Sequence, residues 1–217
     1  MWKWILCCAG LTTSAPNPQP ARQAPYKARK LYPVDESSRD ASFATFRKRL
    51  LAAIEKRDRR FILSSLSRDI QNTFGGNSGV DGFKEHWNFN ARDSEFWAEL
   101  RTAILLGCTR ESKREFWAPY VFSRFPRGLD GYGYTYINGR NVNVRSRPDR
   151  SAPALAKLTY AIVALPSDRD ESTEDWHNIV TPSGMKGFVF HKYPIDYRAC
   201  FKKIRGRWRM TFFVAGD

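Results

Sequence analysis

The pattern of hydrophobic and polar positions changes its period near residue 136. Beyond that point, apolar side chains recur at every second position, as in a β-strand with one buried face. Val142 and Val144 alternate with polar residues, and Pro148 then ends this strand because proline has no backbone N–H for a ladder. A second strand has four side chains on one face: Leu158, Tyr160, Ile162 and Ala164. Residues 176–190 predict a hairpin, and these short strands together predict a small antiparallel barrel.

Before residue 136, the apolar positions have the spacing of amphipathic helices. The first predicted helix carries its apolar stripe on Phe43, Phe46, Leu50 and Ile54, with Ser42 as its N-cap. Further helices are predicted after Asp58 and over residues 80–87 and 94–107. Residues 41–135 are therefore predicted to form a helical N-terminal half, which packs beside the barrel.

A last hairpin pattern follows the barrel region at residues 197–214. Ala199, Phe201, Trp208 and Met210 share its apolar face, and basic residues alternate with them. Two arrangements fit this pattern. The hairpin either extends the sheet of the barrel, or it pairs with the N-terminal half and leaves the barrel as an insertion.

Three features of the barrel region carry a resemblance. Val142-Asn143-Val144-Arg145 is followed by Pro148, Trp176 opens the third strand, and Gly187-Phe188-Val189 lies in the fourth. These residues resemble the bacterial Src-homology-3 domain over residues 137–195. The resemblance implies a five-stranded barrel, found mostly in envelope and secreted proteins, that serves as a binding module.

A weaker similarity involves the two regions that flank the barrel. The final hairpin, with its Gly206-x-Trp208-x-Met210 pattern, is similar to the last hairpin of ketosteroid-isomerase-like (nuclear-transport-factor-2-like) domains. The N-terminal helix pair that leads to Phe74-Gly75-Gly76 is similar to the opening of that fold. This similarity implies an apolar pocket with an inward carboxylate as general base, for which Asp69, Asp81 and Glu85 are available.

These patterns predict an α+β protein with five segments. Residues 1–15 are a signal peptide, residues 16–40 a disordered Pro-rich linker, and residues 41–135 the helical region. Residues 136–196 are the Src-homology-3-like barrel and residues 197–217 an extra C-terminal β-hairpin. Lys3 and the apolar residues after it predict export to the periplasm or the cell exterior, and Cys7 and Cys8 leave a lipid anchor open.

Charge narrows the class of partner without naming it. The formal charge is +14, and seven basic against two acidic residues fall both in residues 47–60 and in residues 191–217. Such a surface favours anionic partners, whether nucleic acid, anionic lipid or wall polymer. A nucleic-acid interface made of residues 47–60 and 202–209 requires both segments to lie on one face.

The sequence shows no catalytic motif and no metal site, and it predicts no cofactor. Its three histidines lack a second histidine at metal-ligand spacing, and the glycines after Phe74 lack the spacing of a phosphate-binding loop. Cys108 and Cys200 either pair in an oxidising compartment or remain buried free thiols.

The resemblance therefore implies a non-catalytic binding protein of the cell envelope that recognises wall peptide or a protein partner. The predicted ligand surface consists of Tyr160, Trp176, His177, His191 and Tyr193, with Arg145 and Arg147 at its rim. The alternatives are a ketosteroid-isomerase-like small-ligand pocket or enzyme, and a basic nucleic-acid-binding protein. Membrane association is predicted only through the N-terminal signal or anchor.

Overall fold

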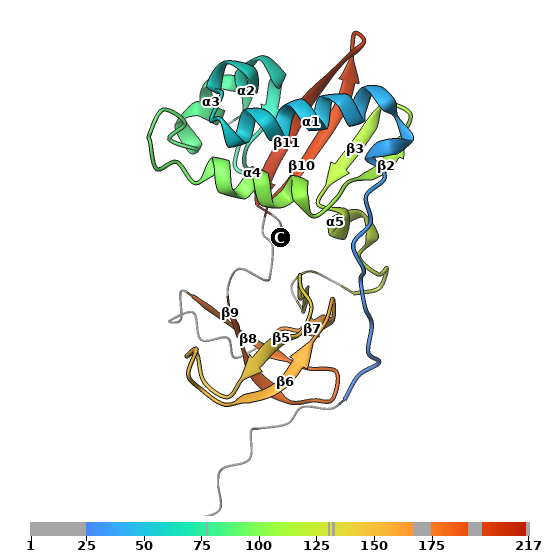
Figure 1. The fold of residues 1–217 in the computed structure, drawn as a ribbon, viewed down its shortest axis with the longest axis vertical. Coiled ribbons are helices and arrows are strands. Elements are labelled where there is room, and N and C mark those ends of the chain that lie inside the picture. Colours follow the sequence, from blue (N-terminus) through green and yellow to red (C-terminus); the bar gives the residue numbers. More distant parts are fainter. Residues whose placement is uncertain are drawn as a thin grey trace, which may run out of the picture.

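The structure is a computed structural model that describes residues 25–76, 78–129, 131, 133–166, 175–190 and 197–215. It is an α+β fold with two sheets, one of five strands and one of six (Figure 1). The predicted signal peptide, residues 1–15, lies outside the described residues. Within them, no helix has the length and apolar character needed to cross a membrane.

The five-stranded sheet combines strands from both ends of the chain. Its order is β1-β11-β10-β3-β2, and only the pair β1–β11 is parallel. The strands are β1 (Leu66–Gln71), β2 (Thr109–Ser112), β3 (Glu115–Ala118), β10 (Tyr197–Ile204) and β11 (Arg207–Ala215). The C-terminal hairpin β10–β11 is thus the centre of this sheet. It is not an extra element beside the barrel, and residues 41–135 are not only helical, because β1, β2 and β3 lie within them.

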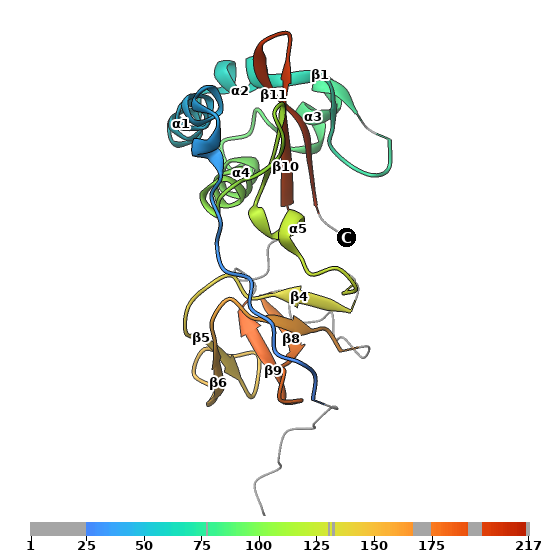
Figure 2. The same ribbon diagram turned by 90° about the vertical axis from the view of Figure 1, so that its right-hand side faces the viewer.

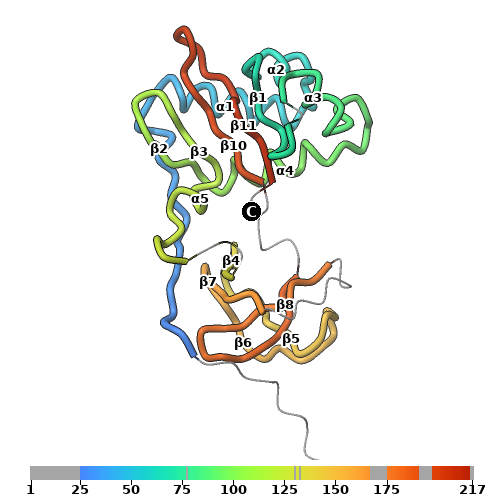
Figure 3. Tube along the Cα trace, turned by 180° about the vertical axis from the view of Figure 1, so that it is seen from behind, coloured from blue at the N-terminus to red at the C-terminus, as the bar shows by residue number. Residues whose placement is uncertain are grey.

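Helices cover one face of this sheet and leave the other open. They are α1 (Ala41–Glu55), α2 (Arg59–Ser65), α3 (Gly79–His86) and α4 (Phe96–Leu105). Figure 2 shows α1 and α4 on the same side of β10 and β11, and from behind (Figure 3) no helix crosses β2, β3, β10 or β11. On this open face Trp117 and Phe212 are half-buried and Lys202 is exposed. Cys200 and Val214 alternate with them along the same face but are buried.

Aromatic rings fill the space between the helices and the sheet. Phe43 of α1 stacks on Phe116 of β3 with ring centroids 3.8 Å apart, and Phe96 of α4 meets the edge of Phe213 of β11 at 5.7 Å. The N-cap of α1 is Asp40, whose carboxylate accepts the N–H of Phe43, and not Ser42 as predicted. The Ser42 hydroxyl instead accepts the indole N–H of Trp208 and an N–H of Lys203, which holds the hairpin against α1.

The six-stranded sheet is inserted between β3 and β10, after the short helix α5 (Tyr120–Arg124), and we call residues 134–190 the module. Its order is β4-β7-β8-β9-β5-β6. The strands are β4 (Tyr134–Tyr136), β5 (Val142–Arg145), β6 (Ala154–Leu158), β7 (Ile162–Ala164), β8 (Trp176–Val180) and β9 (Lys186–Phe190). Within the described residues no pairing joins the edge strands β4 and β6, so the sheet is open where a closed barrel was expected.

The core of the module follows the predicted alternation. Val142 and Val144 are buried together with Ile179 and Val189, and the β8–β9 hairpin pairs Trp176 with Phe190. Gly187 lies on the core-facing side of β9, where a Cβ atom would come within 2.6 Å of Val144 Cγ1. Only glycine lets β9 approach β5 so closely.

Residues 25–40 pack against both sheets, which contradicts the prediction of a disordered linker for this part of residues 16–40; residues 16–24 lie outside the described residues. Residues 29–31 pair with the backbone of residues 160–162, and a 3₁₀-helix follows at Ser37–Arg39. The buried Glu36 accepts the N–H of Arg110 and an N–H of Arg124. The segment therefore connects the module to the five-stranded sheet (Figure 1).

Candidate functional site

The predicted ligand surface divides into separate places in the structure. Trp176 and His177 are neighbours in β8, so their side chains point to opposite faces of the sheet. His177 pairs with the buried Val189 and shares the core-facing side, whereas Trp176 points outward. Tyr160 lies just before the first residue of β7, near the turn that follows β8. Trp176 is the first residue of β8 and lies at the opposite end of that strand.

Tyr160 belongs to the contact with the N-terminal segment. Its backbone has φ +46°, its carbonyl accepts the N–H of Leu31, and its ring meets the ring of Tyr32 edge to face at 5.8 Å. Tyr160 therefore serves packing and does not join Trp176 in one surface. His191 and Tyr193 lie outside the described residues.

One group of side chains does gather around Trp176, on the outer face of the six-stranded sheet. Arg145 and Phe188 are paired across β5 and β9, and Trp176 and Phe190 are paired across β8 and β9. Alternation along each strand places these four side chains on the same face. With Arg150 from the β5–β6 turn they form what we call the module cluster: Arg145, Arg150, Trp176, Phe188 and Phe190.

Cations and rings are in direct contact within the module cluster. The guanidinium carbon of Arg150 lies 4.5 Å from the ring centroid of Phe190, and the ring of Trp176 meets Phe190 edge to face at 5.5 Å. Arg145 donates a 2.6 Å hydrogen bond to the carbonyl of Ala152, which fixes the turn that carries Arg150. Arg147 is exposed on the same turn. Half-buried rings beside arginines suit a ligand with both apolar groups and negative charge.

A second group of rings surrounds an arginine on the open face of the five-stranded sheet. We call it the sheet cluster: Phe74, Trp117, Phe122, Arg198 and Phe212. The guanidinium carbon of Arg198 lies 5.5, 5.3 and 5.6 Å from the centroids of Phe74, Phe122 and Phe212. Trp117 contacts Phe212 at 5.4 Å. The sequence alone did not predict this cluster, because its members come from four separate segments of the chain.

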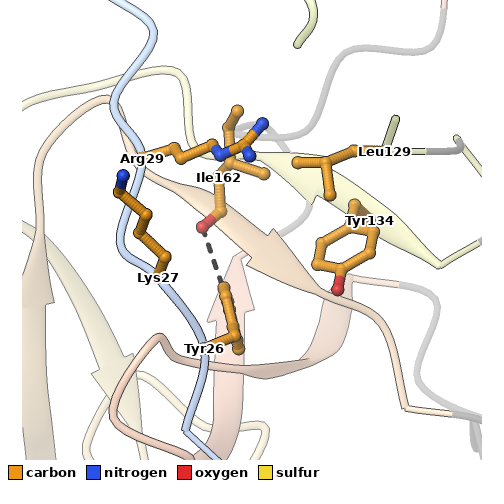
Figure 4. Close-up of a pocket in the computed structure, with 6 residues that line it drawn as sticks. All are labelled: Tyr26, Lys27, Arg29, Leu129, Tyr134 and Ile162. Atoms are coloured by element: carbon orange, nitrogen blue, oxygen red, sulfur yellow. Dashed lines mark hydrogen bonds between the residues drawn. The ribbon is translucent and has the colours of Figure 1, made fainter. Parts of the chain in front are cut away.

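A small hollow lies where the N-terminal segment meets the module (Figure 4). Its volume is about 100 Å³, and its walls are Tyr26, Lys27, Arg29, Leu129, Tyr134 and Ile162. Pockets for small organic ligands usually enclose about 300 Å³ or more, so this hollow is too small for one. Tyr26 and Tyr134 meet edge to face across it at 5.8 Å, and the hollow is part of the packing of the segment.

Part of the first basic segment, residues 56–60, lies away from Lys203 of the second. Lys203 reaches Ser42 at the first turn of α1, whereas residues 56–60 follow the last turn. A helix of 15 residues is about 22 Å long, so the two groups lie at its opposite ends. Several of these cations also have partners within the protein, since Arg57 and Arg59 donate to the carbonyls of Arg92 and Asn90.

The side chains considered for catalysis have surroundings that do not suit a general base. Asp69, Asp81 and Glu85 are exposed, and the helix–sheet interior beside them is filled with rings. The buried carboxylate is Glu36, and the N–H of Arg110, with Arg124 and Arg39 beside it, holds its pKa below the ordinary value. A base that works near neutral pH needs the opposite shift.

The described part of the chain contains two cysteines, Cys108 and Cys200. Cys108 and Cys200 are free and buried, so they do not pair, and burial raises the pKa of each thiol to about 12. No group of histidine, cysteine and acidic side chains within the described ranges could hold a metal ion. Comparison of the chain with protein-family models, with curated proteins and with solved structures found no match.

Proposed function

We propose that the protein is a non-catalytic binding protein of the cell envelope, and that its bacterial Src-homology-3-like module recognises wall peptide or a protein partner. The observation that carries the proposal is the contact between Arg150, Phe190 and Trp176 on the outer face of the module. Peptide stems of the cell wall combine free carboxylates with short apolar side chains. An arginine held against half-buried rings matches both chemical features at once.

The buried alternation of β5 and the β8–β9 hairpin support a Src-homology-3-like fold for the module. The strand order β4-β7-β8-β9-β5-β6 places the first strand of the module, β4, at one edge of the sheet and the last strand, β9, inside it. The five-stranded sheet and its helices support a ketosteroid-isomerase-like fold that carries the module as an insertion. Because aromatic rings fill the interior of that domain, the proposal places the ligand on the module and not in an enclosed pocket.

The experiment is a pull-down of the purified full chain on isolated peptidoglycan, beside immobilised double-stranded DNA, at about 50 mM and about 200 mM salt. The proposal expects retention on peptidoglycan at both salt concentrations. Arg150→Gln removes the cation–ring contact and reduces the affinity about fivefold to tenfold, as does Phe190→Ala. Arg205→Gln changes an exposed arginine in the turn of the β10–β11 hairpin and serves as the matched control.

The outcomes separate the proposal from its alternatives. Retention on DNA that disappears at the higher salt concentration, without retention on peptidoglycan, would establish the nucleic-acid alternative instead. Retention on peptidoglycan that falls equally in Arg150→Gln and Arg205→Gln and stays unchanged in Phe190→Ala would mean that net charge, and not the module cluster, is responsible. Binding to neither material would remove the wall as the ligand.

A further inference from the structure

The open face of the five-stranded sheet carries a feature that the proposed function does not use. We propose that the sheet cluster is a second binding site, which takes a single carboxylate of a polypeptide together with an apolar group next to it. The site is separate from the module cluster, because its residues come from β3, β10, β11, α5 and the loop after β1. It does not depend on the function proposed for the module.

Arg198 is the centre of the site. Three rings surround its guanidinium group, and its Nε atom is buried without a hydrogen-bond partner. Among the described residues Arg198 makes no ion pair. Buried polar atoms of native proteins are usually hydrogen-bonded, and Nε of the half-buried Arg198 is not. A carboxylate bound from outside would satisfy the guanidinium group.

The charge of the surroundings indicates how many negative charges the ligand has. Lys202 lies on the same face of β10, but its ammonium group is 3.8 Å from the carboxylate of Glu115. Glu115 also accepts the indole N–H of Trp117 at 2.7 Å, which fixes it in place. Glu115 therefore offsets Lys202, while Arg209, which pairs with Lys202 across β10 and β11, adds a further cation on this face. Within the sheet cluster itself Arg198 is the one charged side chain, so the cluster has a charge of +1. A single carboxylate matches that charge.

The rings indicate the apolar part of the ligand. Phe74 is 53% exposed at the edge of the site, and Trp117, Phe122 and Phe212 are half-buried around Arg198. A nucleic acid or another polyanion requires a row of cations, whereas the residues that surround Arg198 in the sheet cluster are uncharged rings. A carboxylate with an apolar neighbour, such as the C-terminal residue of a peptide, can place its charge on Arg198 and its side chain on the rings.

The probe for the test is N-acetyl-leucyl-phenylalanine, as the free acid and as the C-terminal amide. Each is titrated into the ¹⁵N-labelled full chain, and the indole resonance of Trp117 is assigned with Trp117→Phe. We expect the free acid to shift this resonance with a dissociation constant of about 1 mM or lower, and the amide to bind at least about tenfold more weakly. Equal affinities for the two forms, or no shift at about 10 mM free acid, would overturn the proposal.

Variants assign the effect to the cluster. Arg198→Met removes the preference for the free acid, and Arg198→Lys retains part of it because the charge remains. Phe74→Ala changes an exposed ring, so the fold is preserved, and it weakens the binding of acid and amide alike. Phe190→Ala in the module leaves both affinities unchanged. A preference for the free acid that survives in Arg198→Met would overturn the proposal. A dimer of the chain that buries this face would also overturn it, if the free acid does not dissociate that dimer.

Discussion

The hydroxyl of Tyr26 provides a sharp test of how the N-terminal segment is held on the module. It accepts the N–H of Ala164 at 2.9 Å and donates to the carbonyl of Val180 at 2.8 Å, where β7 and β8 separate. The carbonyl of Ile162 is 3.5 Å away, and this contact, drawn as a dashed line in Figure 4, is too long to contribute much. Tyr26→Phe removes both short hydrogen bonds and keeps the edge-to-face contact of the ring with Tyr134.

The expected cost follows from these two bonds. Each contributes a net of about 0.5–1.5 kcal/mol, and the variant leaves a backbone N–H and a carbonyl without partners in a partly buried place. The free energy of unfolding should therefore fall by about 1–3 kcal/mol. Urea denaturation followed by circular dichroism measures this difference. Tyr32→Phe is the matched control, because the side chain of Tyr32 is 53% exposed, and its cost should be within about 0.5 kcal/mol of zero.

The same hydroxyl predicts a dependence on pH. Burial is the main cause that raises the pKa of Tyr26 from 10.0 to about 12. The unfolded chain therefore releases this proton first, so the contribution of Tyr26 is fully present below pH 10.0 and is lost as the pH rises to about 12. Tyr26→Phe should lack this component of the alkaline loss. If Tyr26→Phe costs no more than Tyr32→Phe, the segment is not held on the module in the way described.

Two further perturbations test the connection between the sheets and the core of the module. Glu36→Gln removes the charge that pairs with Arg124 and should lower the free energy of unfolding in urea by about 1–3 kcal/mol at pH 7. The folded-state pKa of Glu36 lies below 4.5, so the stability difference between wild type and Glu36→Gln is fully present above pH 4.5. It shrinks as the pH falls through the lowered pKa. A difference that is unchanged at about pH 2 would count against the ion pair. Gly187→Ala places a Cβ atom 2.6 Å from Val144 and should lower the free energy of unfolding by about 1–3 kcal/mol in the same assay. Gly75→Ala is the control, because Gly75 has space around it, and should change the stability by less than about 0.5 kcal/mol. Similar values for the two variants would contradict the close approach of β9 to β5.

The regular elements could be predicted from local sequence patterns. The apolar stripe of α1 and the alternation of Val142 and Val144 depend only on which face of one element is buried, and the structure buries those faces. The β10–β11 hairpin was also predicted, because Arg205 and Gly206 form a turn between two alternating runs. Such signals lie within a few residues of one another in the chain.

The pairing of the hairpin could not be predicted from the same signals. Both of its edges have backbone groups that need partners, and alternation says nothing about which strand provides them. The answer depends on β1 and β3, which lie more than 75 residues before β10 in the chain. The composition of the N-terminal segment likewise does not predict where the segment packs. Its prolines are typical of a free linker, but Tyr26 and Glu36 fix it to the two sheets.

The candidate surfaces were the hardest part to predict, because each joins residues from distant elements. Trp176 and Arg145 were expected on one surface, and their strands do place them on one face of the module. Arg150 and Phe190 were not predicted. The alternation of Phe188 and Phe190 in β9 was a signal that could have indicated Phe190. No local signal connects Arg198 with the rings of the sheet cluster, since that arrangement exists only after β10 pairs with β3 and β11.

The central claim is that the module cluster binds a wall peptide, and a titration of the ¹⁵N-labelled full chain with soluble stem peptides from peptidoglycan tests it most directly. The indole resonance of Trp176, assigned with Trp176→Phe, should move with added peptide in the wild type. The dissociation constant obtained from this shift should be about fivefold to tenfold higher in Arg150→Gln, in which the cation against Phe190 is lost. A Trp176 resonance that stays in place while other parts of the chain respond, or equal affinities for the wild type and Arg150→Gln, would contradict the claim.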